Sequence, residues 1–451
     1  MAAGAFGGKG RVLRHPAQYI ALTFFGTTLL GTLLLSLPMA RRGPGAAPIT
    51  TALFTATSAT CVTGHAVVDT PTYWSGFGQV VVVALVQVGG LGIMTLSSLL
   101  MIVLSRRLGL RQRIIAAAET GTLRLGDVRA LLLSVVKMTM VAEMATAVVL
   151  FLRLWLTHDN SFARSWALAG FHAVSAFNNA GFALYSDNLV SFQNDPIILI
   201  VIGVAVIVGG LGFPVWRQIL AHPRSPKLWD LHTKITMLTT VGLLATGWVA
   251  FMWFEWTNPA TLGPLSTTDS VVNGFFQSVT TRTAGFNSID IGAMNDTSHL
   301  MTILLMFIGG GSGSTAGGIK VTTFALLGFV MWAEVRGEKD VSVFRRRVPT
   351  DVQRQALTVA LAAVGVVAAS TMLLLSITHF ELEDVAFESV SALGTVGLTT
   401  GITPALPVLA QWVVAALMFL GRIGPPTLFA ALVLRDRDRL YRHPEERIII
   451  G

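Results

Sequence analysis

The chain has 451 residues, of which 53% are hydrophobic and only 12% are charged, and its formal net charge is +8 with a sequence pI near 10.1. Soluble globular domains carry about 25% charged residues, so this composition excludes a water-soluble globular protein. The charges stand in clusters between long apolar stretches, which also excludes a disordered or fibrous chain.

Eight apolar stretches follow in chain order, and each has the roughly 20 residues that a helix needs to cross a bilayer. They cover residues 17–39, 80–104, 130–156, 197–220, 235–256, 300–334, 357–377 and 408–434. Most of the 32 Lys and Arg residues stand in blocks at residues 9–14, 106–137, 217–234, 336–354 and 435–447. With a cytoplasmic N-terminus, the alternating spans place every block on the cytoplasmic side, as the positive-inside rule requires. The sequence therefore predicts a multi-pass cell membrane protein with both termini cytoplasmic, and topology rather than nucleic-acid binding explains the basic charge.

A shorter segment, which begins with phenylalanine and reaches a glycine ten residues later, follows each odd-numbered span. The four segments read FTATSATCVTG, FHAVSAFNNAG, FFQSVTTRTAG and FESVSALGTVG, and they end at Gly64, Gly181, Gly285 and Gly397. Small or hydroxylated residues fill their middles, as at Ser58, Ser175, Ser278 and Ser391. Each segment is too short to cross a bilayer. We therefore expect each to form a half-helix of about two to three turns that enters from outside and returns as an extended loop.

Irregular backbone at membrane depth is tolerated only where it lines a water-filled cavity, so the four loops should converge on one axis. The C-terminal end of a half-helix is the negative end of its dipole and favours a cation there. Rings of backbone carbonyls can replace the hydration shell of such an ion, and glycine permits the left-handed conformations that align them. The predicted fold is an all-α integral membrane protein. It has four tandem helix–pore-loop–helix repeats, with eight transmembrane helices and four half-helices around one pseudo-fourfold pore.

The repeats define the expected organisation of the chain. Residues 1–16 form a cytoplasmic N-terminus, 17–105 the first repeat, and 106–221 the second repeat with its preceding basic loop. Residues 222–335 form the third repeat, 336–435 the fourth, and 436–451 a cytoplasmic tail.

A glycine cluster interrupts the sixth span. It comprises Gly309, Gly310, Gly311, Ser312, Gly313, Ser314, Thr315, Ala316, Gly317 and Gly318, and Lys320 follows it. The cluster contains a G-x-G-x-x-A string, but a dinucleotide site needs a βαβ unit, which a transmembrane span cannot supply. Close packing of helices is one interpretation of these glycines. We favour the other, in which the helix breaks into a loop beneath the four half-helices.

Among the ionisable residues inside predicted spans, Arg422, Lys320 and Glu143 call for an interpretation. Arg422 lies about 24 Å along a helix from Leu406 and about 18 Å from Leu434, too far for its side chain to reach either interface. It either pairs with a carboxylate in the bundle or forms a cationic barrier on the ion path. Lys320 either reaches towards the interface or takes part in gating. Glu143 is interpreted as a polar contact facing the bundle and not as a proton carrier.

Other polar residues give no chemical signature. Cys61 and His65 lack a third ligand or an orienting carboxylate, so neither a metal site nor a nucleophile is predicted. Paired carboxylates and HExxH motifs are absent from the sequence, so we expect no enzyme activity. The outer acidic residues either concentrate cations at the pore mouth or are ordinary solvated loop residues; they are Asp69, Asp187, Asp290 and Asp296.

The strings TCVTG, NNAGF, RTAGFN and GTVGL resemble the four filter loops of the Trk/Ktr/HKT potassium transporters, and the resemblance covers nearly the whole chain. It is greatest to the KtrB branch of membrane subunits, whose members begin directly with the first repeat. The resemblance implies that potassium binds to backbone carbonyls of Val62, Thr63, Asn179, Ala180, Thr283, Ala284, Thr395 and Val396, with Gly64, Gly181, Gly285 and Gly397 as the filter glycines. In plant relatives serine at the first glycine position is associated with sodium, so Gly64 favours potassium.

The same resemblance implies a role for the glycine cluster and a set of partners. The cluster, Lys320 and Arg422 would form an intramembrane gate. The partners would be a second copy of the chain, in a homodimer with one pore per protomer, and a cytosolic RCK-type (KtrA-like) nucleotide-binding ring. No cofactor is expected in the chain, potassium is the substrate, and sodium is a candidate activator. The expected function is potassium uptake; a proton-coupled secondary cation transporter and a membrane sensor without transport are the alternatives.

Overall fold

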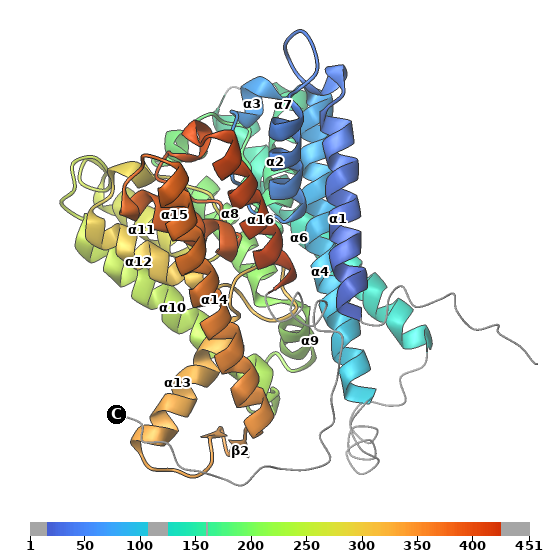
Figure 1. The fold of residues 1–451 in the computed structure, drawn as a ribbon, viewed down its shortest axis with the longest axis vertical. Coiled ribbons are helices and arrows are strands. Elements are labelled where there is room, and N and C mark those ends of the chain that lie inside the picture. Colours follow the sequence, from blue (N-terminus) through green and yellow to red (C-terminus); the bar gives the residue numbers. More distant parts are fainter. Residues whose placement is uncertain (1–15, 107–124, 159–160, 425–451) are drawn as a thin grey trace, which may run out of the picture.

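A computed structural model describes residues 16–106, 125–158 and 161–424, which form a helical bundle (Figure 1). The first part of the chain contains α1 (Pro16–Leu35), η1 (Pro38–Ala40), α2 (Ile49–Thr60), α3 (Thr70–Tyr73) and α4 (Gly76–Arg106). The next contains α6 (Leu125–Thr157), α7 (Phe162–Phe177), η2 (Val190–Phe192), α8 (Pro196–Leu211), α9 (Phe213–Ala221) and η3 (Pro226–Leu228). Then follow α10 (Leu231–Glu255), α11 (Thr267–Thr280), η4 (Ile291–Ala293), α12 (Asp296–Phe307) and α13 (Val321–Val335). The last described elements are β1 (Ser342–Val343), β2 (Arg346–Arg347), α14 (Thr350–Ile377), α15 (Leu382–Gly394), η5 (Thr403–Ala405) and α16 (Val408–Ile423).

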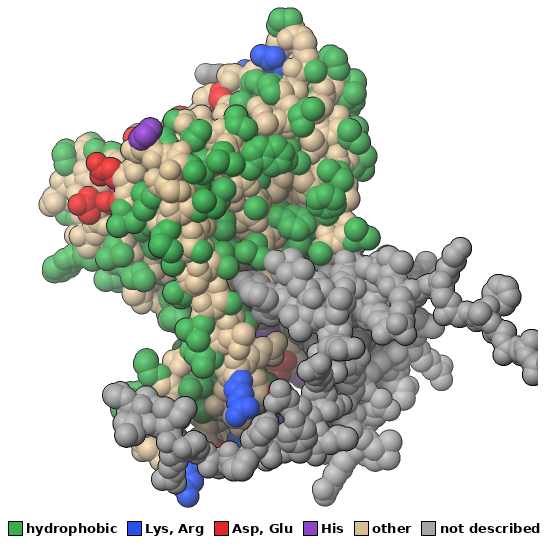
Figure 2. All heavy atoms as spheres, viewed as in Figure 1, with side chains coloured by type: hydrophobic (Ala, Val, Ile, Leu, Met, Phe, Trp, Pro, Cys, Tyr) green, Lys and Arg blue, Asp and Glu red, His purple; other side chains and the backbone are tan. Residues whose placement is uncertain are grey.

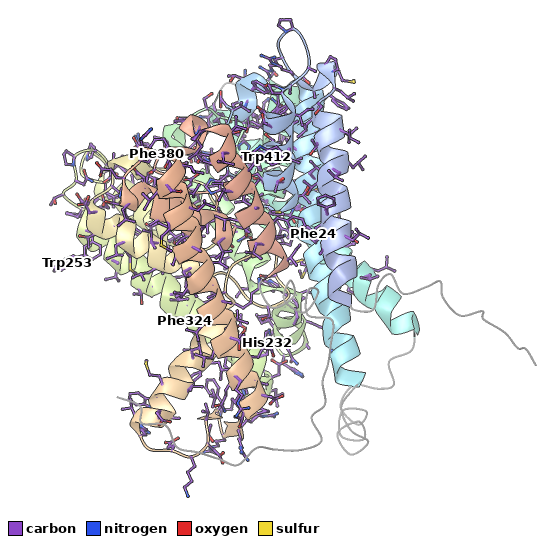
Figure 3. The ribbon with its side chains drawn as sticks, in the orientation of Figure 1. Phe24, His232, Trp253, Phe324, Phe380 and Trp412 are labelled. Atoms are coloured by element: carbon purple, nitrogen blue, oxygen red, sulfur yellow. The ribbon has the colours of Figure 1, made fainter. Side chains whose placement is uncertain are left out.

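The outer surface of the bundle is apolar. Among the described residues three helical stretches are by themselves long and apolar enough to cross a membrane, at Leu132–Thr157, Leu231–Glu255 and Thr350–Ile377. Hydrophobic side chains spread over the broad upper block of the molecule in Figure 2. Trp253 on α10 is 81% exposed and points away from the bundle in Figure 3. Such a surface is typical of a multi-pass membrane protein, which confirms the predicted helical membrane class.

The fourth predicted span, residues 197–220, is not one straight helix. It is divided into α8 and α9, which are bent by 96° at Gly212. Gly212 has a φ of +92°, and Pro214 follows within the first turn of α9. Glycine tolerates this conformation and proline cannot donate the helical hydrogen bond, so the prediction of one continuous helix was wrong.

The sixth predicted span contains the break that its glycines suggested. α12 ends at Phe307 and α13 begins only at Val321, with the glycine cluster between them. α13 and α14 then project below the rest of the bundle in Figure 1. A two-stranded antiparallel hairpin, β1 and β2, joins them, which is a small departure from the predicted all-α fold. Its turn residues Phe344 and Arg345 both have positive φ, as a type I′ turn requires.

Four short helices, α2, α7, α11 and α15, lie within the bundle and end at the predicted loops. They have 12, 16, 14 and 13 residues, or about three to four and a half turns, so the predicted length of two to three turns was too short. α7 packs on α4, α11 on α8, α15 on α12, and α2 on α16. Since each short helix contacts a helix of the segment before it, and α2 contacts the last helix, the arrangement closes into a ring.

Candidate functional site

The four predicted filter glycines lie side by side at the centre of the ring. A Cβ atom on Gly181 would lie 2.8 Å from the carbonyl oxygen of Ala284, which precedes Gly285. A Cβ on each of the other three would also overlap the carbonyl oxygen before the next glycine: Gly64 meets Ala180, Gly285 meets Val396, and Gly397 meets Thr63. The contacts run in one cyclic order through all four loops. No side chain larger than hydrogen fits at these positions without opening the ring.

The four loops share an unusual backbone conformation. The residue two positions before each glycine has a positive φ, with values of 57° at Val62, 59° at Asn179, 68° at Thr283 and 51° at Thr395. Three of these residues are β-branched, for which a positive φ is a genuine outlier that costs about 1–3 kcal/mol. The glycine that follows is again left-handed in every loop. The same strain recurring four times indicates that the surrounding structure enforces one backbone path.

Backbone amides of the loops point back towards the helices that precede them. The N–H groups of Thr63, Ala180 and Val396 each donate to a serine carbonyl five residues earlier, at Ser58, Ser175 and Ser391, over 2.8 Å. In the third loop Ala284 N–H donates to Thr280 O over 3.0 Å, only four residues earlier. Ser278, grouped with the other serines in the sequence, instead donates its hydroxyl to Leu244 O over 2.8 Å. The third loop is therefore anchored by Thr280 and not by a serine.

The carbonyl groups of the loops have no such partners. No donor in the described part of the chain reaches the carbonyl oxygens of the two residues before each glycine; these residues are Val62, Thr63, Asn179, Ala180, Thr283, Ala284, Thr395 and Val396. All eight residues are buried. Buried backbone carbonyls are almost always paired, so eight unpaired ones in one ring require a ligand or water. Backbone oxygens at the C-terminal ends of four helices are suited to a dehydrated monovalent cation.

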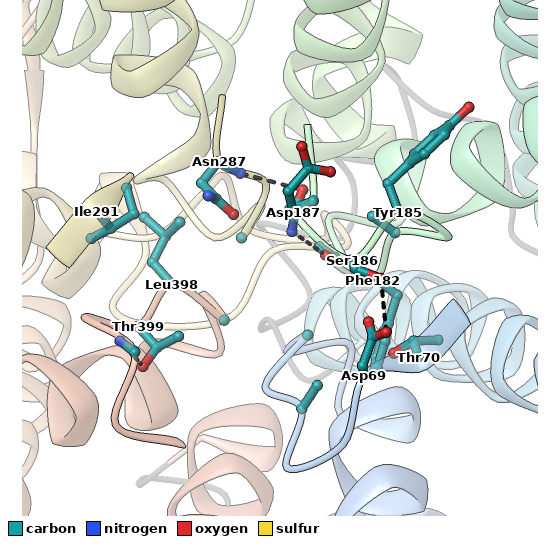
Figure 4. A pocket seen from close by; sticks show the side chains of 18 of the residues that line it. Asp69, Thr70, Phe182, Tyr185, Ser186, Asp187, Asn287, Ile291, Leu398 and Thr399 are labelled. Atoms are coloured by element: carbon teal, nitrogen blue, oxygen red, sulfur yellow. Dashed lines mark hydrogen bonds between the residues drawn. The ribbon is translucent and has the colours of Figure 1, made fainter. Parts of the chain in front are cut away.

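A cavity of about 520 Å³ opens onto the ring (Figure 4). All four glycines line it. Asp69, Asp187 and Asp290 also line it, whereas Asp296 is not among its lining residues. Ser186 donates a hydrogen bond of 2.8 Å to the Asp69 carboxylate, which holds that carboxylate at the wall. Three of the four outer aspartates therefore line the cavity above the four glycines.

The glycine cluster, residues 309–318, lies against the other end of the same loops. Thr315 Oγ1 is 3.2 Å from Phe177 O and 3.1 Å from the side-chain amide of Asn179. A Cβ on Gly317 would overlap Thr395 Oγ1, and Gly311 N–H donates to Gly210 O over 2.8 Å. The segment is mostly buried and contacts the second and fourth filter loops directly.

The two cations predicted at this gate both bind backbone carbonyls. Arg422 is 3% exposed and donates to Thr315 O and, over 3.0 Å, to Gly89 O. Lys320 Nζ donates to Ala316 O over 2.6 Å, so it turns into the cluster rather than towards the interface. Neither forms a salt bridge with a carboxylate among the described residues, so the alternative of a buried ion pair for Arg422 finds no support. Arg422 instead ties the cluster to α4.

Sequence reasoning missed a third cation beside the cluster, Arg282, which is buried. Arg282 in the third filter loop donates to Thr240 O over 3.3 Å and to Gly309 O over 3.2 Å. It thereby connects the third loop to the start of the glycine cluster. The sequence could have identified Arg282, because it is the only Lys or Arg in the four short segments.

Glu143 makes the polar contact that was predicted for it. Its carboxylate accepts hydrogen bonds from Asn178 Nδ2 over 3.0 Å and from Gln87 Nε2 over 3.3 Å. Asn178 immediately precedes the second filter loop, so this contact supports the loop from behind. Among the described residues no group of three or more His, Cys, Asp or Glu side chains is arranged to hold a metal ion.

The chain is similar to known proteins over nearly its whole length. A family model described as "TrkH: Cation transport protein" matches residues 15–441. The chain is 38% identical to the Ktr system potassium uptake protein B of Bacillus subtilis, over 97% of each chain. It is 37% identical to the potassium/sodium uptake protein NtpJ of Enterococcus hirae, over 98% of this chain and 99% of that one. The crystal structure of the potassium transporter TrkH from Vibrio parahaemolyticus has a similar fold, with a TM-score of 0.74 at 20% identity over 94% of this chain and 86% of that one.

Proposed function

Because the chain belongs to the TrkH family of cation transport proteins, we propose that it takes up potassium across the cell membrane through the ring of four filter loops. The observation that carries this proposal is the set of eight buried carbonyl oxygens that no donor reaches from the residues the structure describes. They offer neutral, closely spaced oxygen ligands to an ion that has lost its water. No carboxylate belongs to the ring, so the ion is held by dipoles and can leave again.

The proposal includes the repeat architecture. Residues 17–105, 106–221, 222–335 and 336–435 each supply two spans and one half-helix, giving eight spans around one pore, with residues 1–16 and 436–451 cytoplasmic. α8 and α9 together count as one bent span, and α12, the glycine cluster and α13 as one broken span. The apolar outer surface and the cyclic packing of α2, α7, α11 and α15 support this organisation. The last part of the eighth span, residues 425–434, lies outside the described residues.

The gate in this proposal is the glycine cluster with Lys320 and Arg422. It lies against the filter loops at the end away from the outer cavity, where it blocks the path of the ion. Three cations, the buried Arg282 and Arg422 and the partly buried Lys320, surround it without a carboxylate partner among the described residues. Their positive charge repels potassium until the cluster moves.

The proposal also extends to partners and ions. The relative in Bacillus subtilis is named as part of a Ktr system, which implies further subunits, and we propose a homodimer regulated by a cytosolic RCK-type nucleotide-binding ring. The relative in Enterococcus hirae is named for potassium and sodium, and we propose sodium as an activator. The relatives named here are transporters, and the proposal contains no enzymatic step.

Complementation tests the proposal directly. The native chain should restore growth on low potassium to a bacterium that lacks its own uptake systems. Gly64→Ser should reduce the preference for potassium over sodium, because its Cβ would overlap Ala180 O across the ring. Failure of the native chain to restore growth, at normal membrane abundance, would refute the function. An unchanged ion preference in Gly64→Ser would refute the filter assignment.

A further inference from the structure

The residue after each filter glycine is anchored in the protein, and the first loop differs from the others in how this is done. The second, third and fourth loops have Phe182, Phe286 and Leu398 at this position, each at most 2% exposed and each part of a hydrophobic cluster. In the first loop the corresponding residue is His65, which is 1% exposed. A polar side chain therefore occupies a site that is apolar three times out of four.

Backbone anchoring at this position divides the four loops into two pairs. Ser175 donates its hydroxyl to Phe182 O over 2.7 Å, and Thr280 donates to Phe286 O. In the first and fourth loops the hydroxyls of Ser58 and Ser391 instead accept from Gly64 N–H and Gly397 N–H, each over 3.1 Å. The carbonyl of His65 has no donor among the described residues. The polar contacts of the His65 residue are thus made by its side chain.

The partner of His65 is a carboxylate from the far end of the chain. His65 Nδ1 lies 3.4 Å from Glu388 Oε1, and both side chains are fully buried. Glu388 belongs to α15, the short helix before the fourth filter loop, and the hydroxyl of Thr403 donates to the same oxygen. Glu388 Oε2 and His65 Nε2 have no other partner in the described part of the chain. The carboxylate therefore depends on one hydroxyl and His65.

This contact closes the ring of loops behind the filter. Gly397, which ends the loop after α15, touches Thr63 and Gly64 on the pore side. The pair of His65 and Glu388 joins the first loop to α15, the helix that leads into the fourth loop. His65 Nδ1 also lies 3.4 Å from Thr403 Oγ1, 338 residues later in the sequence. The first loop and the segment around the fourth loop are thus joined at more than one place.

We infer that His65 and Glu388 are positioning residues that set the ion preference of the filter by holding the first loop against the fourth. The inference rests on the proposed function, because it assumes that the ring is the filter. Removing His65 leaves a buried carboxylate with one donor, which favours rearrangement of α15 or of the first loop. A displacement of the Thr63 and Gly64 carbonyls then widens the ring on one side, and the preference for potassium over the smaller sodium ion falls.

The test compares two substitutions at one position in the full chain, reconstituted in liposomes. His65→Leu introduces the residue that the fourth loop carries at this point, so the site stays apolar and buried but loses the donor. His65→Asn retains a side-chain nitrogen close to the position of Nδ1. We expect His65→Leu to lower the ratio of potassium to sodium uptake by about tenfold, and His65→Asn to keep it within about threefold of the native value.

Glu388 provides the second half of the test. Glu388→Gln keeps a hydrogen bond to Thr403 but removes the charge, and it should lower the ratio in the same direction. Adding Glu388→Thr to His65→Leu removes the unpaired carboxylate, and Thr is the residue at the corresponding position of α2, Thr55. This double variant should recover at least part of the lost preference. If the two substitutions only lowered stability independently, the second would not restore the ratio of potassium to sodium uptake.

The outcomes separate this inference from the function on which it rests. An unchanged ratio in His65→Leu, with Gly64→Ser altering it, overturns the inference and leaves the filter intact. Equal losses in His65→Leu and His65→Asn also overturn it, because the donor would then be irrelevant. If His65→Leu does not fold, as judged by its melting temperature, His65→Asn and Glu388→Gln carry the test on ion preference. Absence of potassium uptake by the native chain refutes the proposed function itself.

Discussion

A single methyl group at Gly397 should disable the filter. Gly397 has a φ of +91°, and a Cβ there would overlap the carbonyl oxygen of Thr63 and lie 3.1 Å from Gly64 Cα. The left-handed backbone alone costs a non-glycine residue about 1–2 kcal/mol. The overlap adds a displacement of the Thr63 carbonyl, which is one of the proposed ion ligands. Each 1.4 kcal/mol of lost coordination lowers ion binding about tenfold, so we expect potassium uptake by Gly397→Ala to fall at least about tenfold.

Gly401 provides a matched control in the same loop region. Its φ is +107°, but a Cβ on Gly401 would meet nothing within 4 Å. Gly401→Ala therefore carries comparable backbone strain without the collision in the ring. We expect both variants to lose about 1–2 kcal/mol of stability, and only Gly397→Ala to lose uptake and ion preference.

The assay is the uptake of potassium and sodium by liposomes that contain equal amounts of each variant, with melting temperatures recorded in parallel. If the two variants reduce uptake to the same extent, the effect is one of backbone strain and the reasoning from the ring is refuted. The reasoning from the ring is also refuted if Gly397→Ala transports potassium with the native preference over sodium.

Three further predictions concern the gate, the membrane interior and the outer loops. Deletion of residues 311–317 should raise the rate of potassium uptake, because it removes the backbone that covers the filter; an unchanged rate would contradict gating by the cluster. Glu143→Gln should leave uptake within about threefold of native, since the amide can still accept hydrogen bonds, and loss of uptake would instead favour proton coupling. Asp195 is the N-cap of α8 and accepts hydrogen bonds of 2.9 Å from Arg153 and His158. Burial raises the pKa of Asp195, but the hydrogen bonds from His158 and Arg153 outweigh it and hold that pKa below its ordinary value. Asp195→Asn should therefore cost about 2 kcal/mol at neutral pH, and its difference from the native chain in thermal unfolding should shrink as pH falls through the lowered pKa.

Local patterns in the sequence were sufficient for the membrane class and for locating the four loops that end at a left-handed glycine. A helix in lipid must be apolar for about 20 residues, so spans are visible in any window of that length. A loop that returns through the membrane must be short, small and polar, and it needs glycine where φ is positive. Gly64, Gly181, Gly285 and Gly397 were therefore recognisable without any contact between them.

Hydropathy was less informative where helices bend. The bend at Gly212 and the break after Phe307 both lie inside apolar stretches. Glycine density predicted the second, where six glycines stand together, and missed the first, where a single left-handed glycine and one proline are enough. The lengths of α2, α7, α11 and α15 were underestimated. A helix continues as long as its backbone hydrogen bonds are satisfied, whether or not a sequence motif marks its ends.

The sequence by itself determined what each segment is, because the solvent around it is lipid and lipid imposes length, polarity and glycine at fixed places. Only the tertiary structure decided what each segment touches. Arg422 donates to Thr315 and Gly89, and His65 lies beside Glu388, although more than 100 residues separate the partners in each case. Such contacts depend on how four loops close into one ring, and the energy of that closure is not encoded in any local pattern.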